Sequence, residues 1–297
     1  MEEFTAMPPF VYVVTLNWNR TADTINFLES SVRLTYPCFR TLVVDNASDA
    51  GSIKEIYATF PEAEVIVNPS NLGFSNGMNV GIDHALREGA DFVFIANNDT
   101  TLAPDLLDQL VETACSEGAD VTSPAIYYME PDDRIWSIGG WRSPVNYEIL
   151  QAYHRLDISK TTQSFQVDFT TGCGMLLSRQ CVEKVGFFDP RFFMYYEDSD
   201  YCLRAQRMGC KLWVVPKAKM WHRVAASICG INSPGERYYM GLSSVLFFRK
   251  HVRGWHWLVV LPYRFASAVK TVFTLISHDC GPSARAYLHG LYDGLRV

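Results

Sequence analysis

The sequence predicts an α/β protein with a central, mostly parallel sheet and a helical extension at its C-terminal end. Short apolar runs rich in β-branched residues alternate with longer helical segments through residues 10–96. Such nearly uninterrupted apolar runs are typical of parallel strands that helices cover on both faces. A polar cluster follows most of these runs, and basic and aromatic residues gather in the last part of the chain.

The predicted strands and helices alternate in this first part. Strands are expected at 10–16, 41–45, 64–68 and 91–96, and helices at 21–34, 52–60 and from the glycine-punctuated turn 71–79 to about residue 87. The polar groups 17–19, 45–46 and 97–99 directly follow three of the strands. Because ligands of open parallel sheets collect at the carboxyl ends of the strands, we expect these groups to meet on one rim.

After residue 121 the pattern changes to shorter, mixed segments. One of them, 165–178, surrounds Gly172-Cys173-Gly174; a helix is expected at about 198–208 and a strand at 211–215. We therefore predict one domain over residues 1–230 and a helical, basic and aromatic extension over residues 231–297.

Charge and cysteine content exclude some classes of protein. The extension holds eight Lys or Arg and three Asp or Glu, a net charge of +5 that leaves −11 on residues 1–230. An acidic body argues against nucleic-acid binding, which needs a basic face. Eight scattered cysteines without a Cys-x-x-Cys pair favour a reducing compartment and argue against a thiolate zinc site. Residues 1–9 lack a signal-peptide pattern, so we expect a cytoplasmic protein.

Residues 238–278 are rich in aromatic and apolar side chains. Arg253, Pro262, Arg264 and Lys270 interrupt the stretch, which therefore does not read as a membrane-spanning helix. Mixed Trp, Tyr, Phe and Arg suit a helix lying at the inner face of a membrane. Packing on the domain or on a second subunit of a homodimer is the equal alternative.

Three groups of residues are candidates for chemistry. Asp99 follows a buried strand, where a carboxylate can hold a divalent cation against a diphosphate, although a turn that caps the next helix explains it as well. Glu197 and Asp198 lie with Asp200 at the start of a helix. The helix dipole and a pairing of Asp200 with Arg204 account for some of this charge, and an apolar setting would suit a general base.

His222 is the third candidate, because imidazole beside a carboxylate and phosphate oxygens is a reasonable ligand set for Mn²⁺. Packing or surface placement is the plainer reading of a single histidine. Cys173 has no histidine near it in sequence, so we expect a tight backbone approach between the glycines rather than a thiol nucleophile. Neither a Gly-x-Gly-x-x-Gly motif after the first strand nor a Gly-Lys-Ser/Thr loop is present.

Taken together, the chain resembles glycosyltransferase family 2, inverting enzymes with a GT-A fold, and within it the rhamnosyltransferase-like branch. The resemblance covers about residues 10–225. It rests on an ordered set of short motifs: Leu16-Asn17-Trp18-Asn19, Val43-Val44-Asp45-Asn46-Ala47-Ser48, Asn71-Leu72-Gly73-Phe74 with Asn79, Asn97-Asn98-Asp99, Gly172-Cys173-Gly174-Met175, Phe188-Asp189, the acidic stretch Glu197–Arg204, and Trp221-His222.

The resemblance implies a role for each matching residue. Asp45 would recognise the nucleotide base, and Asn17, Asn71 and Asn79 would belong to the nucleotide site. Asp99 would hold Mn²⁺ or Mg²⁺ with His222, while Asn97 replaces the first acid of the family's Asp-x-Asp motif and, with Asn98, would lie near the nucleotide. Asp198 would be the base, with Glu197 beside it.

The implied reaction is transfer of rhamnose or a hexose, with inversion, from dTDP-rhamnose or a UDP-sugar to a glycan or lipid-linked acceptor. A metal for the leaving group and a base for the attacking hydroxyl are the equipment this needs. Two rival readings stay open. A nucleotidyltransferase would want a glycine-rich basic loop, which 17–20 matches poorly, and a non-catalytic sugar- or nucleotide-binding module would need no base.

Overall fold

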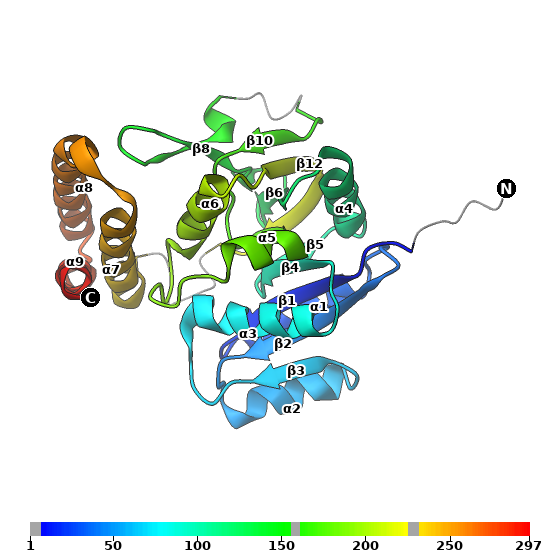
Figure 1. The fold of residues 1–297 in the computed structure, drawn as a ribbon. Coiled ribbons are helices and arrows are strands. Elements are labelled where there is room, and N and C mark those ends of the chain that lie inside the picture. The colour runs from blue at the N-terminus through cyan, green and yellow to red at the C-terminus, as the bar shows by residue number, and fades with distance from the viewer. Residues whose placement is uncertain (1–6, 156–160, 225–231) are drawn as a thin grey trace.

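The computed structural model describes residues 7–155, 161–224 and 232–297, which form a layered α/β body flanked by three C-terminal helices (Figure 1). The strands are β1 (Val11–Asn17), β2 (Phe39–Asp45), β3 (Glu64–Val67), β4 (Phe92–Asn97), β5 (Thr100–Leu102), β6 (Val121–Tyr128), β7 (Ile135–Ser137), β8 (Gly140–Arg142), β9 (Ile149–Gln151), β10 (Phe165–Val167), β11 (Gly174–Ser178) and β12 (Leu212–His222).

The helices are α1 (Thr21–Ser31), α2 (Ala50–Thr59), α3 (Gly73–Arg87), α4 (Leu106–Glu117), α5 (Arg179–Val185), α6 (Glu197–Arg207), α7 (Pro234–His251), α8 (Trp257–Ser277) and α9 (Gly281–Arg296). Short 3-10 turns lie at Ala152–His154 and Gly254–His256. Residues 11–97 form alternating strands and helices as the sequence pattern predicts, and the ends of these elements differ from the predicted ones by a few residues.

The main sheet has the order β10-β12-β6-β11-β4-β1-β2-β3. The strands β3, β2, β1 and β4 are mutually parallel, as their apolar character predicts. On one face pack apolar side chains of α3, α5 and α6, and on the other those of α1, α2 and α4. Both faces are therefore buried, which explains why these strands show no alternation of polar and apolar residues.

The second half of the sheet is mixed. β11 runs antiparallel to both β4 and β6, and β12 runs parallel to β6. Consequently β6 and β12 point the same way as β4, and their carboxyl ends reach the same rim. A mostly parallel central sheet is confirmed, with β5, β7, β10 and β11 as antiparallel members.

The strand expected at 211–215 is longer than predicted. An irregularity between Val215 and Lys219 interrupts its pairing with β6, after which β12 continues to His222. The final residues pair with β6 on one side and β5 on the other, so the strand survives Pro216 because that proline lies in the irregular segment. This extension carries His222 to the rim.

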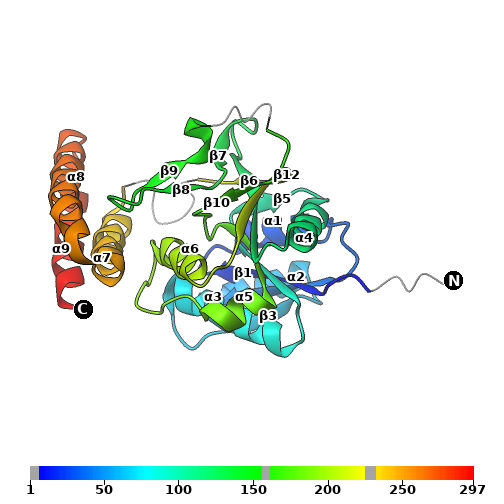
Figure 2. The same ribbon diagram turned by 45° about the horizontal axis from the view of Figure 1, so that its top comes forward.

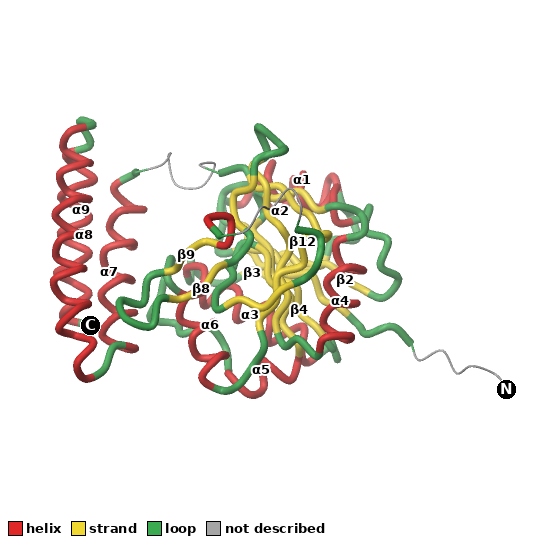
Figure 3. Tube along the Cα trace, turned by 90° about the horizontal axis from the view of Figure 1, so that it is seen from above, coloured by secondary structure: helices red, strands yellow, loops and turns green. Residues whose placement is uncertain are grey.

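The C-terminal helices stand together beside the sheet, on the side of α6 (Figure 3). α7 contacts the body, because Leu246 and Phe247 share an apolar cluster with Phe192 and Leu203. α7 and α9 cross closely: a Cβ on Gly290 would collide with the backbone carbonyl of Tyr238. The hairpin of β8 and β9 reaches from the sheet toward the same helices (Figure 2).

Candidate active site

The ends of β1 and β2 carry a buried polar cluster. The Asn17 amide donates to Asp45 Oδ1 (2.7 Å) and to the Ser52 hydroxyl (3.0 Å). The Ser48 backbone N–H and hydroxyl both donate to the Asp45 carboxylate, at 2.9 and 2.6 Å. Asn17 and Asp45 are fully buried, so the cluster fixes the loop after β2. Contact of Asp45 with a nucleotide base stays a prediction.

A second set of amides joins this loop to the start of α3. Asn46 donates to the Gly73 carbonyl at 2.9 Å and to Asn71 Oδ1 at 3.3 Å, and the Gly73 N–H donates to the same Asn71 oxygen. Gly73 has φ +75°, and a Cβ there would lie 2.5 Å from the Phe193 carbonyl oxygen. Only glycine allows this approach, which brings the loop with Asn71 against the segment that precedes α6.

The remaining predicted nucleotide-site residues have different surroundings. Asn98 donates to the Thr24 hydroxyl, which in turn donates to Asn17 Oδ1, so Asn98 belongs to the same network. The Asn97 N–H donates to the Cys173 carbonyl, which ties the end of β4 to the Gly172–Gly174 segment. Asn79 exchanges two bonds with the backbone of Phe188, and its polar groups are thereby committed to holding the chain.

Asp99 and His222 form the candidate metal pair. Asp99 Oδ1 lies 3.1 Å from His222 Nε2, and both side chains are about nine-tenths buried. Asp99 Oδ1 and both ring nitrogens nevertheless lack a partner in good hydrogen-bonding geometry. Buried polar atoms without partners are costly, and a cation between them would satisfy them. The donor set therefore fits a divalent metal.

No group of three or more His, Cys, Asp or Glu within the described residues could hold a metal alone. The protein would supply two ligands, and the other positions would fall to phosphate oxygens and water. This is the usual arrangement for a metal that binds together with a phosphate substrate rather than permanently.

The segment Gly172–Gly174 lies between the metal pair and the candidate base. The fold brings the Cys173 thiol near His222, although no histidine lies near Cys173 in sequence. Burial raises the pKa of this thiol, which keeps it neutral. On the other side, the Gly172 N–H donates to Asp198 Oδ2 at 3.3 Å.

Glu197 and Asp198 begin α6, directly after Tyr195 and Tyr196, which both have positive φ. Such strained backbone at two successive residues is common at functional sites. Burial raises the pKa of both carboxyls, and the charge of Asp198 raises that of Glu197 further. Asp198 accepts N–H bonds from Ser199 (2.6 Å) and Gly172, whereas Glu197 Oε2 is buried without a partner. Asp198 is therefore the carboxyl that ionises first.

Arg142 was not predicted from the sequence. From β8, this half-buried guanidinium donates to the Ser199 carbonyl, and its charge offsets part of the rise that burial causes in the pKa of Asp198. It lies 5.3 Å from the centre of the Phe247 ring of α7. No local pattern marks Arg142, because its place near Asp198 arises only when the β8–β9 hairpin folds over α6.

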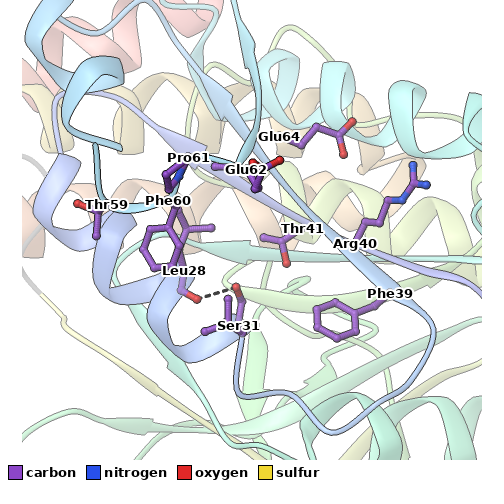
Figure 4. A pocket seen from close by; sticks show the side chains of 12 residues that line it. Leu28, Ser31, Phe39, Arg40, Thr41, Thr59, Phe60, Pro61, Glu62 and Glu64 are labelled. Atoms are coloured by element: carbon purple, nitrogen blue, oxygen red, sulfur yellow. Dashed lines mark hydrogen bonds between the residues drawn. The ribbon is translucent and has the colours of Figure 1, made fainter. Parts of the chain in front are cut away.

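A hollow of about 600 Å³ lies elsewhere, at the amino ends of β2 and β3 (Figure 4). Its lining includes Leu28, Phe39, Phe60 and Glu64. None of the predicted site residues contributes to it. The chemistry therefore belongs to the opposite edge of the sheet.

Comparison with known proteins identifies relatives of this arrangement. Residues 8–233 match the family described as "Glycosyltransferase like family 2". A dTDP-rhamnosyl transferase, RfbF of Shigella flexneri, is 24% identical over 248 residues, covering 81% of this chain and 80% of the relative. An N-acetylglucosaminyl-diphospho-decaprenol L-rhamnosyltransferase of Mycobacterium tuberculosis is 25% identical over 247 residues, covering 72% and 76%.

Solved structures show the same fold. Mannosyltransferase PcManGT of Pyrobaculum calidifontis, in complex with GDP-Man and Mn²⁺, superposes with a TM-score of 0.60 at 17% identity, over 95% of this chain and 75% of that one. GalNAc-T7 with UDP, GalNAc and Mn²⁺ gives 0.63 at 14% identity over 82% of this chain, which spans half the length of GalNAc-T7. The expected GT-A fold is confirmed.

Proposed function

Since the chain belongs to the glycosyltransferase-like family 2 and is a glycosyltransferase, we propose that it transfers rhamnose or a hexose, with inversion and with a divalent metal, to a glycan or lipid-linked acceptor. The observation that carries this proposal is the placement of two different carboxylate sites on one rim. Asp99 with His222 suits a cation, and Asp198 suits a base. Those are the two tasks of sugar transfer from a nucleotide.

The donor is dTDP-rhamnose or a UDP-sugar. The curated relatives named above transfer rhamnosyl groups, which favours dTDP-rhamnose. Asn71 and Asn98 offer half-buried amides on the β1–β2 side of the rim for the nucleotide, and the buried Asn17 and Asp45 hold the loop beside them. Mn²⁺ or Mg²⁺ bound by Asp99 and His222 would stabilise negative charge on the departing diphosphate.

Asp198 is proposed to take the proton from the acceptor hydroxyl. Its two backbone donors keep it ionised at neutral pH better than Glu197, while burial keeps its basicity above that of an ordinary aspartate. The attacking oxygen then forms the new bond to the anomeric carbon as the bond to the diphosphate breaks. A single base without a protein nucleophile gives inversion.

A panel of sugar nucleotides with Mn²⁺, Mg²⁺ or EDTA tests the donor and the metal. We expect slow release of nucleoside diphosphate from one donor class in the presence of metal, and loss of release in EDTA. Isothermal titration of Mn²⁺ with wild type and His222→Ala, with nucleotide present, adds a readout that does not depend on turnover. Metal binding that is equal in the two proteins would contradict the assigned ligands.

The acceptor is proposed to be presented at a membrane, and α8 would provide the contact. One face of this helix is apolar and more than half exposed, formed by Leu258, Leu261, Phe265, Val269, Phe273 and Ile276 at helical spacing. We call these six residues the α8 face. Lys270 and the net positive charge of the extension suit an anionic lipid surface. Gly254–Ser277, which includes α8, is by length and composition also long and apolar enough to cross a membrane.

Flotation with anionic phospholipid vesicles tests this contact. Deleting the extension would uncover Phe192 and Leu203, so substitution is the cleaner change. We expect Leu261→Glu with Phe265→Glu to abolish flotation, whereas Tyr57→Glu, at a half-exposed position on α2, leaves it intact. Flotation unaffected by the double substitution would contradict the proposal. A concentration-dependent dimer that the same substitution dissociates would assign the α8 face to a second copy instead.

A further inference from the structure

A hollow of about 480 Å³ opens at the carboxyl end of β6. Its lining combines aromatic rings with two exposed charges: Tyr127, Tyr128, Asp133, Arg134, Trp136 and Tyr153. We call it the aromatic hollow. Because β6 runs parallel to β4, the aromatic hollow lies on the same rim as the candidate active site.

The aromatic hollow adjoins the metal pair. The Trp136 ring meets the His222 ring edge-on, with 4.5 Å between centroids, and Tyr128 pairs with His222 in the sheet. In strand order β6 and β12 lie on one side of β4, and β1 and β2, which carry the predicted nucleotide cluster, lie on the other. A nucleotide whose base lies on the β1–β2 side and whose diphosphate reaches the metal pair therefore leaves the aromatic hollow, on the far side of that pair, open.

The lining has the chemistry of a sugar site. The guanidinium of Arg134 stacks over the Tyr128 ring, 4.8 Å from its centre. Within the described ranges, the side chains of Asp133 and Arg134 have no hydrogen-bond or ion-pair partner, so they are free to bind hydroxyls. Aromatic faces accept the apolar C–H side of a pyranose, and a donor and an acceptor at the edge match its hydroxyl rim.

Size agrees with this chemistry. Ligand pockets measure roughly 300–1,000 Å³, so this volume admits about one or two sugar rings but no long lipid chain. The hollow is also linked to the base: Trp136 contacts His222, Cys173 interacts with His222, and Gly172 binds Asp198. A glycan with one hydroxyl at Asp198 can extend past the metal pair toward Trp136.

We infer that the aromatic hollow binds a saccharide unit of the acceptor adjacent to the sugar that receives the transferred residue. This inference rests on the proposed function, since it assumes a glycan acceptor. Tyr153 and Arg134 are specificity-determining residues in this account, because their contacts select acceptors with a second sugar.

Saturation-transfer difference NMR tests the site without turnover. The probes are the disaccharide of two N-acetylglucosamine units and methyl α-L-rhamnoside, each added to the full-length protein with Mn²⁺ and, in separate samples, with dTDP or UDP. The variants are Tyr153→Ala and Arg134→Ala. The matched control is Tyr57→Ala, because Tyr57 and Tyr153 are both 41% exposed and Tyr57 lies on α2.

We expect at least one probe to bind wild type and Tyr57→Ala equally. Removal of an aromatic or stacked contact should weaken it by about two- to tenfold in Tyr153→Ala and Arg134→Ala. Equal binding in all four proteins, or no binding of either probe to wild type, would overturn the inference. Failure of the proposed function shows separately, as absence of nucleotide release from every donor.

Discussion

Asp200 anchors the C-terminal extension to the helix that carries the candidate base. Its fully buried carboxylate contacts Arg204 of α6 at 2.8 Å and Lys250 and His251 of α7 at 2.6 and 2.7 Å. Burial alone would raise the pKa of Asp200, but these partners hold it below its usual range. Asp200→Asn removes the charge while keeping the size of the side chain.

The expected loss is large, because the variant removes a fully buried carboxylate that is the counter-charge of Arg204 and one of the two counter-charges of Lys250, which keeps Asp189 at 2.6 Å. Removing one partner of a buried ion pair typically costs about 3–5 kcal/mol. Urea unfolding at pH 7 measures it. The control is Glu183→Gln, which breaks an exposed pair with Arg179 (3.5 Å) and should cost at most about 0.5 kcal/mol.

The pH dependence gives a second check. The lowered pKa of Asp200 contributes stability above the pKa of an unfolded aspartate, about 4, and that contribution is lost as pH falls through the folded pKa. The difference between wild type and Asp200→Asn should therefore shrink in acid. A cost below about 1 kcal/mol at pH 7 would refute the reasoning, since buried pairs are expected to exceed the surface range.

Three further predictions concern the site. Glu197→Gln should stabilise the protein increasingly from pH 4.5 up to the raised folded pKa of Glu197, by up to about 1.4 kcal/mol per pH unit in thermal unfolding. In this range wild-type Glu197 ionises in the unfolded state but stays protonated in the folded one, which favours unfolding. A pH-independent difference would contradict this. Arg142→Met should move the acid limb of the kcat–pH profile to higher pH, because the charge of the guanidinium lowers the pKa of Asp198. Arg142→Lys should return the limb to its wild-type position. A limb that Arg142→Met leaves unmoved would exclude Asp198 as the titrating base. Gly77→Ala should lower the free energy of unfolding by about 1–3 kcal/mol and raise the donor KM, because the added Cβ would press on Leu16 and Asn46. The control Gly51→Ala has open space around its Cβ and should not destabilise the protein.

The first half of the fold was predictable because its information is local. Each strand of the parallel part is a short apolar run, and each polar group that follows it lies at the rim for topological reasons alone. Asn17, Asp45 and Asn98 were therefore predicted as neighbours, and the structure joins them through Thr24 and direct bonds.

The second half depends on contacts between distant segments. β12 passes an irregularity at Pro216 because β5 and β6 hold its last residues, and neither partner is visible from residues 211–222. Cys173 was separated from any histidine in sequence, yet β11 and β12 bring it to His222. Arg142 and Trp136 lie in strands of three residues, which are too short for a hydrophobic periodicity to predict how they pack.

The domain division at residue 230 stays a prediction, although helix α7 of the extension packs directly on the body. α7 shares both an apolar cluster and the Asp200 ion network with α6. The single stretch 238–278 is in fact divided between α7 and α8, because the 3-10 turn at Gly254–His256 changes the chain direction. The extension is thus held directly against α6, the helix whose first turn carries Asp198.

The central claim is that Asp198 accepts the proton of the acceptor hydroxyl while the metal pair serves the donor. Transfer by Asp198→Asn, measured with an active donor and acceptor beside donor binding by calorimetry, tests it most directly. Loss of a general base should reduce kcat by about 10²–10⁴-fold. Donor affinity in the presence of Mn²⁺ should stay at the wild-type value. Transfer by Asp198→Asn at the wild-type rate would contradict the account.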